Sequence, residues 1–294
     1  IHLVMSNITL FSQIINKLNR YSFNKIVERH KSDRFIKGIN SWTHLVSMLF
    51  CHLAKANSLR EISNGLRSST GNLNHLGINN KCPSKSSLSY INKNRNWELF
   101  KDYYFELLNK YQTIAGFKQI KFRIKKRILL LDSTTISLCL SLYNWARYRQ
   151  TKGAIKLHTL LDYNGCLPVY VNMTDGRKHD VEIAKSLNLP SDSVVVADRA
   201  YLDFKLLYKW HEKGINFVIR LKEPITYIDV KENPLPEGKD EHILKDELVM
   251  LIDSKDKYPK KLRRVAVWDH KNQQTIELIT NNFYWTASTI AELY

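Results

Sequence analysis

The chain has 294 residues, of which 44% are hydrophobic and 25% charged, a globular composition that excludes a disordered or fibrous protein. Lysine and arginine outnumber aspartate and glutamate by 45 to 28, and the formal net charge of +17 favours a polyanionic partner, nucleic acid before membrane. No apolar run reaches the length of a membrane span, residues 1–20 lack a signal-peptide pattern, and the four cysteines form no CxxC pair. We therefore expect a cytoplasmic protein without disulfides, a zinc site or a small-molecule cofactor.

Residues 5–116 carry apolar residues at spacings of three and four, which predicts an all-α N-terminal domain. The segment Trp42–Ala56 is apolar around most of its circumference, so we expect a buried helix there. Ser58 and Glu61 fit a capping box at the start of the next helix, and a second such start follows Pro83. Short helices with Ser- and Asn-rich turns are typical of a helix-turn-helix DNA-binding module, although a plain helical bundle gives the same pattern.

A basic segment opens the second domain, which we place at residues 117–294. Residues 117–128 contain six basic residues and no acid. This segment either contacts phosphates or is a solvated linker or strand edge.

From residue 128 the pattern changes to that of a mixed α/β domain. Three strands come first, and the second and third meet at Asn164-Gly165, a strong hairpin signal. A helix, the strand 193–197, a helix closing on Gly214 and a further strand follow. This order predicts a ribonuclease-H-like mixed sheet with helices on its faces. Residues 223–280 contain four prolines and short strand candidates, so we expect an inserted β-rich subdomain.

Two aspartates follow apolar strands of this predicted sheet. Asp132 ends "RILLLD" and Asp198 ends "SVVVAD". Ligands bind at the carboxyl edge of open α/β sheets, and two carboxylates there would repel each other unless a cation lay between them. Oxygen ligands without nearby His or Cys favour Mg²⁺ or Mn²⁺, and paired ions of this kind assist attack on a phosphodiester. Either aspartate alone is more simply a turn former or helix N-cap, but the pair on a basic chain favours a metal site.

Five blocks in this order resemble the catalytic domain of DDE transposases, and in particular the family of insertion sequence four: "LLLDSTT", "GAIKLHTLLD", "TDGRKHD", "VVVADRAYLD" and "FVIRLK". The segments "LREISNGLR" and "SKSSLSYINKNRNWELF" resemble the helical N-terminal region of one branch of that family. The resemblance covers nearly the whole chain, and family members carry a β-rich insertion before the last catalytic residue.

The resemblance implies that Asp132 and Asp198 are the first two catalytic, metal-binding carboxylates, with two Mg²⁺ (or Mn²⁺) ions in the complete site. The third carboxylate of the family is a Glu in the motif Tyr-x2-Arg-x3-Glu-x6-Lys. Tyr294 matches the tyrosine of this motif, and the sequence stops seven positions before the expected Glu. Glu277 and Glu292 are out of register, so we expect this chain to lack the catalytic Glu and the C-terminal part of the domain.

Further residues are candidates for contact with the DNA backbone or the site: Lys152, Lys156, His158, His179, Arg199, Tyr201 and Tyr294. The lysines are equally compatible with a solvated surface. His179 is either a site residue or part of the cap of the next helix, with Asp180 as the cap residue. Trp268 and Trp285 could stack on a flipped base, although core packing is the simpler interpretation.

The resemblance implies a bacterial, nucleoid-associated transposase that binds the terminal inverted repeats of an insertion sequence and acts on double-stranded element ends and target DNA. It further implies metal-dependent cleavage, a hairpin-end intermediate, strand transfer and a synaptic homodimer. Two other functions remain open: a ribonuclease-H-like DNA nuclease without transposition, and a catalytically dead DNA-binding remnant.

Overall fold

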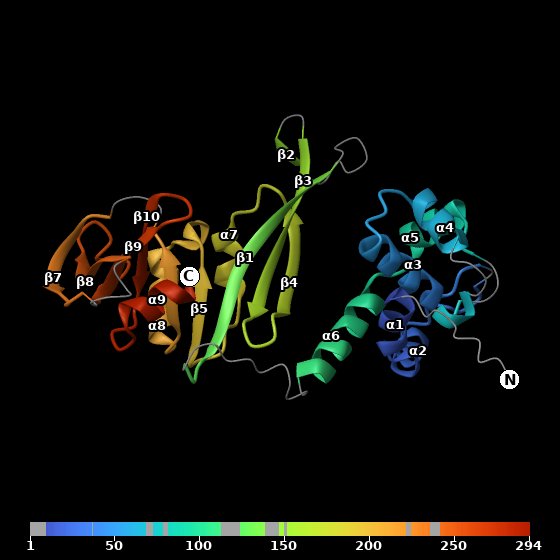
Figure 1. The fold of residues 1–294 in the computed structure, drawn as a ribbon, viewed down its shortest axis with the longest axis horizontal. Coiled ribbons are helices and arrows are strands. Elements are labelled where there is room, and N and C mark those ends of the chain that lie inside the picture. The colour runs from blue at the N-terminus through green and yellow to red at the C-terminus, as the bar shows by residue number, and fades with distance from the viewer. Residues whose placement is uncertain are drawn as a thin grey trace. The chain divides into compact units, whose positions relative to one another are not determined.

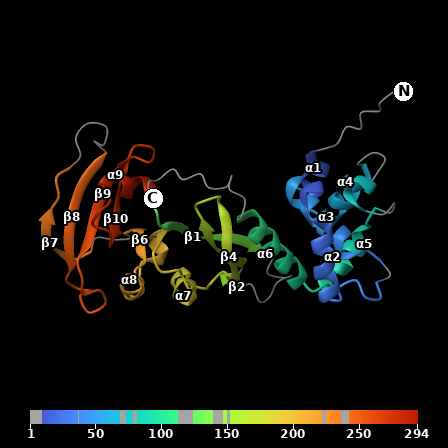
Figure 2. The same ribbon diagram turned by 90° about the horizontal axis from the view of Figure 1, so that it is seen from below.

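The computed structural model describes residues 10–36, 38–68, 73–78, 82–112, 124–138, 147–149, 152–221, 225–235 and 242–294. The chain divides into two compact units, residues 1–113 and 114–294, close to the boundary expected at residue 116. The first unit is helical and the second is built on a sheet (Figures 1 and 2). No helix within the described ranges is long and apolar enough to cross a membrane.

The first unit is all α in its described residues. Its elements are α1 (Leu10–Lys17), α2 (Arg20–Arg29), α3 (Ser41–Leu53), α4 (Leu59–Ser68), the 3₁₀ turn η1 (Leu73–Leu76), α5 (Lys85–Asn94) and α6 (Glu98–Gln112). Their buried faces share one core, in which the rings of Trp42 and Tyr103 both pack edge to face against Phe23, with centroids 5.5 and 4.9 Å away.

The local signals of this unit are largely confirmed. The Glu61 amide donates to Ser58 Oγ (3.2 Å), while the Glu61 carboxylate accepts from the Ser58 hydroxyl (3.2 Å) and from the Asn57 amide (2.9 Å). The helix predicted over Trp42–Ala56 is α3, which is buried in its first half but exposes Leu53 near its end. Residues 69–84 separate α4 from α5, so a tight turn does not join this pair as a simple helix-turn-helix would require.

The described residues of the second unit form a ten-stranded sheet in the order β2-β3-β1-β5-β6-β10-β9-β8-β7, with β4 paired to β3. The strands are β1 (Arg127–Leu138), β2 (Arg147–Arg149), β3 (Lys152–Asp162), β4 (Leu167–Asp175), β5 (Ser193–Ala197), β6 (Asn216–Arg220), β7 (Tyr227–Glu232), β8 (Ile243–Leu251), β9 (Leu262–Asp269) and β10 (Gln274–Thr280). β1–β5 and β5–β6 pair in parallel, and the other pairs are antiparallel. This is the mixed sheet that the sequence predicts.

Helices cover both faces of the sheet at its centre. Leu129, Leu131 and Val195 face α7 (Asp180–Ser186) and α8 (Phe204–Glu212) in one core. The alternate residues Ile128, Val194 and Val196 face α9 (Ala287–Leu293) in a second core. Every residue of β5 is buried, which explains its uninterrupted apolar sequence, because a parallel strand covered on both faces has no solvent side.

The hairpin between β3 and β4 forms at the predicted position. The turn occupies residues 163–166, where Gly165 and Cys166 take positive φ values of 106° and 52°. Glycine adopts this backbone region without strain, so the Asn164-Gly165 signal identifies the turn correctly.

The β-rich segment expected at residues 223–280 is present, and its strands continue the central sheet. β10 pairs antiparallel with β6, so β10, β9, β8 and β7 extend the parallel core outward. One cluster of mostly buried ion pairs joins the strands of this extension. Arg263 donates two hydrogen bonds to Asp246 (2.7 and 2.6 Å), and Arg264 pairs with Glu247 and Glu277 (both 2.7 Å).

Candidate active site

Asp132 and Asp198 lie side by side at the carboxyl edge of two parallel strands. The last residue pair of the β1–β5 ladder is Leu131–Ala197, and each aspartate is the next residue along the chain. Asp132 is exposed and Asp198 is half-buried. The juxtaposition expected from the two apolar runs is therefore present.

One detail of the expectation is wrong. Asp132 does not end its strand, because β1 continues to Leu138 and pairs there with β3, where Asp132 is opposite Thr159. The parallel ladder with β5 does stop before Asp132. Asp132 thus lies on the part of β1 that pairs with β3 and no longer with β5. Figure 1 shows this part of β1 running beside β3 and β4.

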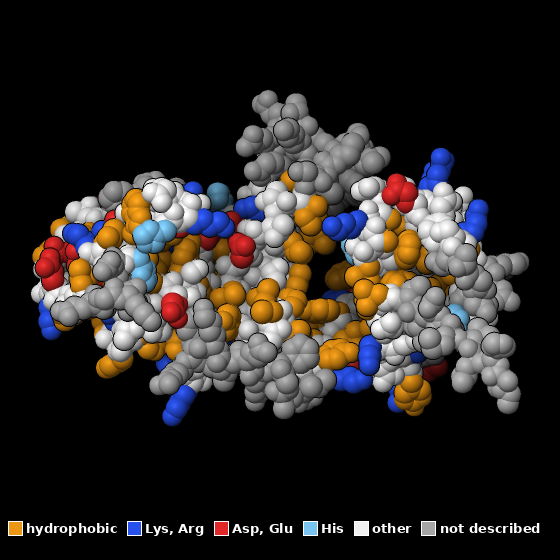
Figure 3. Space-filling view, viewed as in Figure 1, with side chains coloured by type: hydrophobic (Ala, Val, Ile, Leu, Met, Phe, Trp, Pro, Cys, Tyr) orange, Lys and Arg blue, Asp and Glu red, His pale blue; other side chains and the backbone are white. Residues whose placement is uncertain are grey.

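The face of the sheet around Asp132 is open. Asp132 is paired with Thr159, which is paired with Val171, so these three side chains share one face. Along the same strands Ile136, Val171 and Met173 are 41, 42 and 56% exposed. Figure 3 shows hydrophobic side chains at the surface over these strands. A large substrate could therefore approach Asp132 without displacing a described helix.

The two carboxylates interact electrostatically. Burial raises the pKa of Asp198, and the negative charges of Asp132 and Asp180 raise it further. Asp198 also caps the turn η3 (Arg199–Tyr201), because its Oδ1 accepts a hydrogen bond from the Ala200 amide (2.9 Å). The turn-forming role considered for this aspartate is therefore real, and it leaves the carboxylate facing other negative charges that a cation would relieve.

Asp180 is a residue that the sequence analysis treats only as a helix cap. His179 occupies the N-cap of α7 without a side-chain hydrogen bond, and Asp180 is the first residue of the helix. The Asp180 carboxylate, 11% exposed, instead pairs with Lys156 Nζ at 3.0 Å and lies 3.3 Å from Nδ1 of the fully buried His158. The signal available in the sequence is the block "GRKHD" itself, which contains Asp180 as a second candidate beside His179.

A group of buried polar atoms beside the aspartates lacks hydrogen-bond partners in the described part of the chain. These atoms are His158 Nδ1, Asp180 Oδ1 and the Tyr201 hydroxyl. The His158–Asp180 contact is within ion-pair distance but does not have hydrogen-bond geometry. Buried polar atoms normally find a partner, so these three indicate a place for ordered water or another polar ligand.

A hollow of about 580 Å³ opens beside Asp198, between α7 and η3. Its charged lining consists of four acids and two bases: Asp180, Glu182, Asp198, Asp203, Lys185 and Arg199. A net acidic lining suits a cation better than a phosphate.

The residues present fit a magnesium site with two protein carboxylates. Mg²⁺ usually keeps several waters and is held by one or two carboxylates plus substrate phosphates, so Asp132 and Asp198 fit as protein ligands of one such ion. In the described ranges no group of three or more His, Cys, Asp or Glu residues is arranged to hold a metal. Glu277 is engaged by Arg264, and Glu292 is exposed on α9, so neither supplies a third carboxylate in this geometry.

The prediction that His158 and Tyr201 contact DNA is wrong, because both side chains are buried. His158 and Tyr201 are both 0% exposed, because β4 and α7 pack over the first and the sheet core encloses the second. Neither side chain reaches the surface. Burial also raises the pKa of Tyr201, with Asp180 adding to the effect, and burial lowers the pKa of His158.

The remaining candidates differ in how far their side chains are exposed and in whether they already have a partner. Lys156 is committed to Asp180 and to the carbonyl of Lys178 (3.2 Å), which argues against a free phosphate contact. His179 and Arg199 are exposed at the hollow, and Tyr294 is 40% exposed at the end of α9. Trp285 packs against the α9 core, in line with the simpler interpretation.

Two earlier candidates lie partly outside the described residues, while Trp268 lies within them. Lys152 is on β3, but its side chain lies outside the described residues. Most of the basic segment 117–128 does too, and of its described residues Lys126 pairs with Asp192 at 2.8 Å. Trp268 is half-buried on β9.

A mixed sheet with paired carboxylates at the carboxyl edge of its parallel strands defines a ribonuclease-H-like domain. Residues 123–294 match the family model described as a transposase DDE domain, and residues 6–79 match one described as a domain of unknown function, DUF4372. Because the first match covers more than half of the chain, this chain belongs to the DDE-domain transposase family. The resemblance noted on the catalytic blocks is thereby confirmed.

Named relatives agree with this family. The "Probable transposase for insertion sequence element IS5377" of Geobacillus stearothermophilus is 30% identical over 172 residues, which is 58% of this chain and 45% of the relative. The protein y4zB of Sinorhizobium fredii, which also carries a transposase name, is 27% identical over 180 residues, covering 60% of this chain and 50% of its own. The chain thus spans about half the length of the curated relatives it matches.

Among solved structures, a piggyBac transposase synaptic complex with hairpin DNA aligns with 95% of this chain and 61% of its own. The TM-score is 0.43 and the sequence identity 13%, too low to carry an argument about this chain.

Proposed function

We propose that this chain is the DNA-binding and catalytic part of an insertion-sequence transposase. It binds the terminal inverted repeats of its element, as a homodimer, and catalyses metal-dependent cleavage and strand transfer on double-stranded DNA. One observation carries this proposal: Asp132 directly follows Leu131, Asp198 directly follows Ala197, and Leu131 and Ala197 are paired in the parallel β1–β5 ladder. The chain that carries this pair belongs to the DDE-domain transposase family.

The chemistry assigns a role to each carboxylate. Bound Mg²⁺ would activate the attacking water or 3′-hydroxyl and stabilise the leaving oxygen of the phosphodiester. Asp132 and Asp198 would hold the metal from one side, and the open sheet face around Asp132 leaves the other side to DNA. Asp198 is fixed by its hydrogen bond to the Ala200 amide, so its carboxylate is oriented before the metal binds.

The electrostatics of the two aspartates support the same assignment. The pKa of Asp198 lies above its usual range, because burial and the charges of Asp132 and Asp180 disfavour its ionised form. A divalent cation held by Asp132 and Asp198 would favour the ionised form of Asp198. The net charge of +17 supplies the long-range attraction for DNA.

The test is cleavage by the full-length protein of a duplex that carries the terminal repeat flanking its gene. Asp132→Ala and Asp198→Ala are each expected to keep repeat binding in a mobility-shift assay and to lose Mg²⁺-dependent cleavage by at least about a thousandfold, a size typical for removal of a catalytic electrostatic group. Asp229→Asn, which neutralises an exposed carboxylate on β7, is the matched control and is expected to cleave normally.

The outcomes separate the alternatives. Cleavage without joining of the element ends to target DNA would favour a nuclease, and repeat binding without any cleavage by the unmodified protein would favour a non-catalytic remnant. Normal cleavage by either alanine variant would contradict the assignment of the site.

A further inference from the structure

Helix α5 of the N-terminal unit has a polar face that takes no part in the core. Leu88 and Ile91 are buried among the other helices. The opposite side carries exposed residues in two rows at helical spacing of four: Lys85, Ser89 and Lys93 in one, Ser86 and Tyr90 in the other. Tyr90 is 70% exposed, so its ring and hydroxyl are open to a partner.

The charged residues of the sequence segment that carries this face are basic only. Residues 62–97 contain no aspartate or glutamate, although acids make up 28 of the 294 residues of the chain. Arg67, at the end of α4, lies near the start of α5, where it interacts electrostatically with Cys82. A helix face with lysines at both ends and hydrogen-bonding side chains between them is complementary to a polyanion that also presents hydrogen-bond donors and acceptors, as the base edges of a nucleic acid do.

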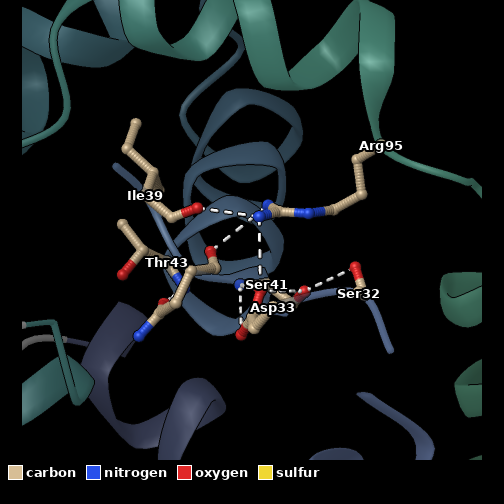
Figure 4. A network of polar contacts seen from close by, with 7 residues as sticks. Ser32, Asp33, Ile39, Ser41, Thr43 and Arg95 are labelled. Atoms are coloured by element: carbon tan, nitrogen blue, oxygen red, sulfur yellow. Dashed lines mark hydrogen bonds and ion pairs between the residues drawn. The ribbon is translucent and has the colours of Figure 1, made fainter. Parts of the chain in front are cut away.

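The helix is fixed at its C-terminal end by a buried network (Figure 4). The guanidinium of Arg95, whose side chain is 4% exposed, donates to the Ile39 carbonyl at 2.7 Å and pairs with Asp33 at 3.3 Å. Asp33 in turn accepts hydrogen bonds from the Ser41 hydroxyl (2.7 Å) and amide (2.9 Å), at the start of α3.

The N-terminal end and the buried side of α5 are fixed as well. Ser84 caps the helix through its hydroxyl, which accepts from the Ser87 amide (3.1 Å). Asn92 Oδ1 lies 3.0 Å from His44 Nε2, and Cys82 donates to the Ser63 carbonyl of α4 at 3.2 Å. Side chains that must meet base edges need a support of this kind, because a small displacement breaks a hydrogen bond.

We propose that α5 enters the major groove of double-stranded DNA and reads the terminal repeat. Lys85 and Lys93 contact phosphates, while Ser89 and Tyr90 contact base edges. This inference rests on the proposed function and names the surface that recognises the element ends. Neither family model covers α5, since the matches end at residue 79 and resume at 123.

The dimensions of α5 agree with this partner. A helix of ten residues is about 15 Å long, and the B-DNA major groove is about 12 Å wide and admits an α-helix. The deep, narrow major groove of A-form RNA does not, so the partner is DNA and not duplex RNA. Serine and tyrosine hydroxyls both donate and accept, which suits them to either strand of a base pair.

The experiment measures fluorescence anisotropy of the full chain with two labelled duplexes of equal length, one carrying the terminal repeat and one a shuffled sequence. Replacing Ser89→Ala and Tyr90→Ala together is expected to lower the preference for the repeat by about tenfold or more, with little change in binding to the shuffled duplex. Replacing Lys85→Gln and Lys93→Gln together is expected to weaken binding to both duplexes equally and to reduce the salt slope by about two.

The charge-matched control is Lys17→Gln with Lys25→Gln, on α1 and α2, which is expected to leave the preference unchanged. Circular dichroism and thermal melting show whether each variant is folded, which is expected because all the altered side chains are exposed. If the unmodified chain prefers the repeat and the Ser89/Tyr90 variant keeps that preference, α5 does not read the repeat, while the proposed function stands. If the unmodified chain shows no preference, both proposals are overturned. Equal affinity of the unmodified chain for an RNA duplex of the same sequence would contradict the assigned partner.

Discussion

The sheet unit contains two clusters of buried charge that differ in how completely they are paired. In the β8–β10 extension, Arg263 and Arg264 engage Asp246, Glu247 and Glu277 through bonds of 2.6 to 3.2 Å. Beside the two catalytic candidates, the cluster at β3 and α7 leaves atoms of His158, Asp180 and Tyr201 without hydrogen-bond partners in the described chain. A cluster in which every buried charge is paired needs no further partner, as expected of a structural cluster. A cluster with unpaired buried polar atoms indicates a place for a ligand.

The largest effect is expected in the fully paired cluster. Arg263→Leu leaves the carboxylate of Asp246 buried without its partner, because both side chains are about 5% exposed. Breaking a buried pair in this way is expected to lower the free energy of unfolding by about 3–5 kcal/mol, measured by urea denaturation.

The matched control uses an exposed pair in the same unit. Lys260 and Glu212 are 2.6 Å apart, and both side chains are 48% exposed. Lys260→Gln is expected to change the free energy of unfolding by no more than about 1 kcal/mol. A loss for Arg263→Leu as small as that of the control would show that the cluster is not structural.

A smaller loss of stability but a larger loss of activity is expected at Asp180. Asp180→Asn removes the charge that pairs with Lys156 and is expected to cost about 1–3 kcal/mol of unfolding free energy. Since Lys156 is then free to approach the aspartates, Mg²⁺ binding should weaken and cleavage should fall by about tenfold or more. The measurements are Mg²⁺ titration by calorimetry and cleavage of the repeat duplex.

Glu182→Gln is the control for Asp180, because Glu182 lies on the same helix and lines the same hollow but is 52% exposed. It is expected to leave both Mg²⁺ binding and cleavage unchanged. Should Asp180→Asn lose stability but keep full Mg²⁺ affinity, the β3–α7 cluster would be structural like the other one.

The contrast between these clusters also shows how far the sequence predicts the site. Asp132 and Asp198 could be predicted because each follows an apolar run, and consecutive parallel strands bring their carboxyl ends together. Asp180 could not, because its partners Lys156 and His158 lie more than twenty positions earlier on β3. Their meeting depends on how α7 packs over the sheet, and no local pattern encodes that approach.

The fold was predictable to a similar extent. Strands and helices of residues 127–220 follow from apolar periodicity and turn residues, and their order predicts the mixed sheet. The β-rich segment is attached to the sheet by the pairing of β10 with β6, in which Leu278 is opposite Arg220. Along the chain, β7, β8 and β9 come between these two strands. Pairing between strands far apart in the sequence leaves no periodic signal, so the sequence predicts a subdomain where the segment continues the central sheet.

The smallest expected effect is on the pH dependence of the unfolding free energy. The two clusters differ here because a histidine titrates in the β3–α7 cluster and a glutamate in the β8–β10 cluster. Burial lowers the pKa of His158, and the neighbouring Lys156 lowers it further while Asp180 opposes the change. A histidine whose folded pKa is depressed binds more protons when unfolded, so it costs stability as the pH falls below its unfolded pKa of about 6.5.

In the other cluster burial raises the pKa of Glu247, but hydrogen bonds from Arg264 and Lys245 outweigh burial and hold this pKa below its usual range. Its contribution persists to about pH 4.5 and is lost at lower pH.

Urea denaturation from pH 7.5 to 4 should therefore show the unfolding free energy decline in two ranges, first below about pH 6.5 and again below about pH 4.5. His44 and His211 also have pKa values lowered by burial, so His158→Gln is expected to reduce the first decline without abolishing it. The second decline should be unchanged in that variant. If His158→Gln leaves the first decline as it was, His158 is not held neutral beside Asp180, and the unpaired atoms at the site have another explanation.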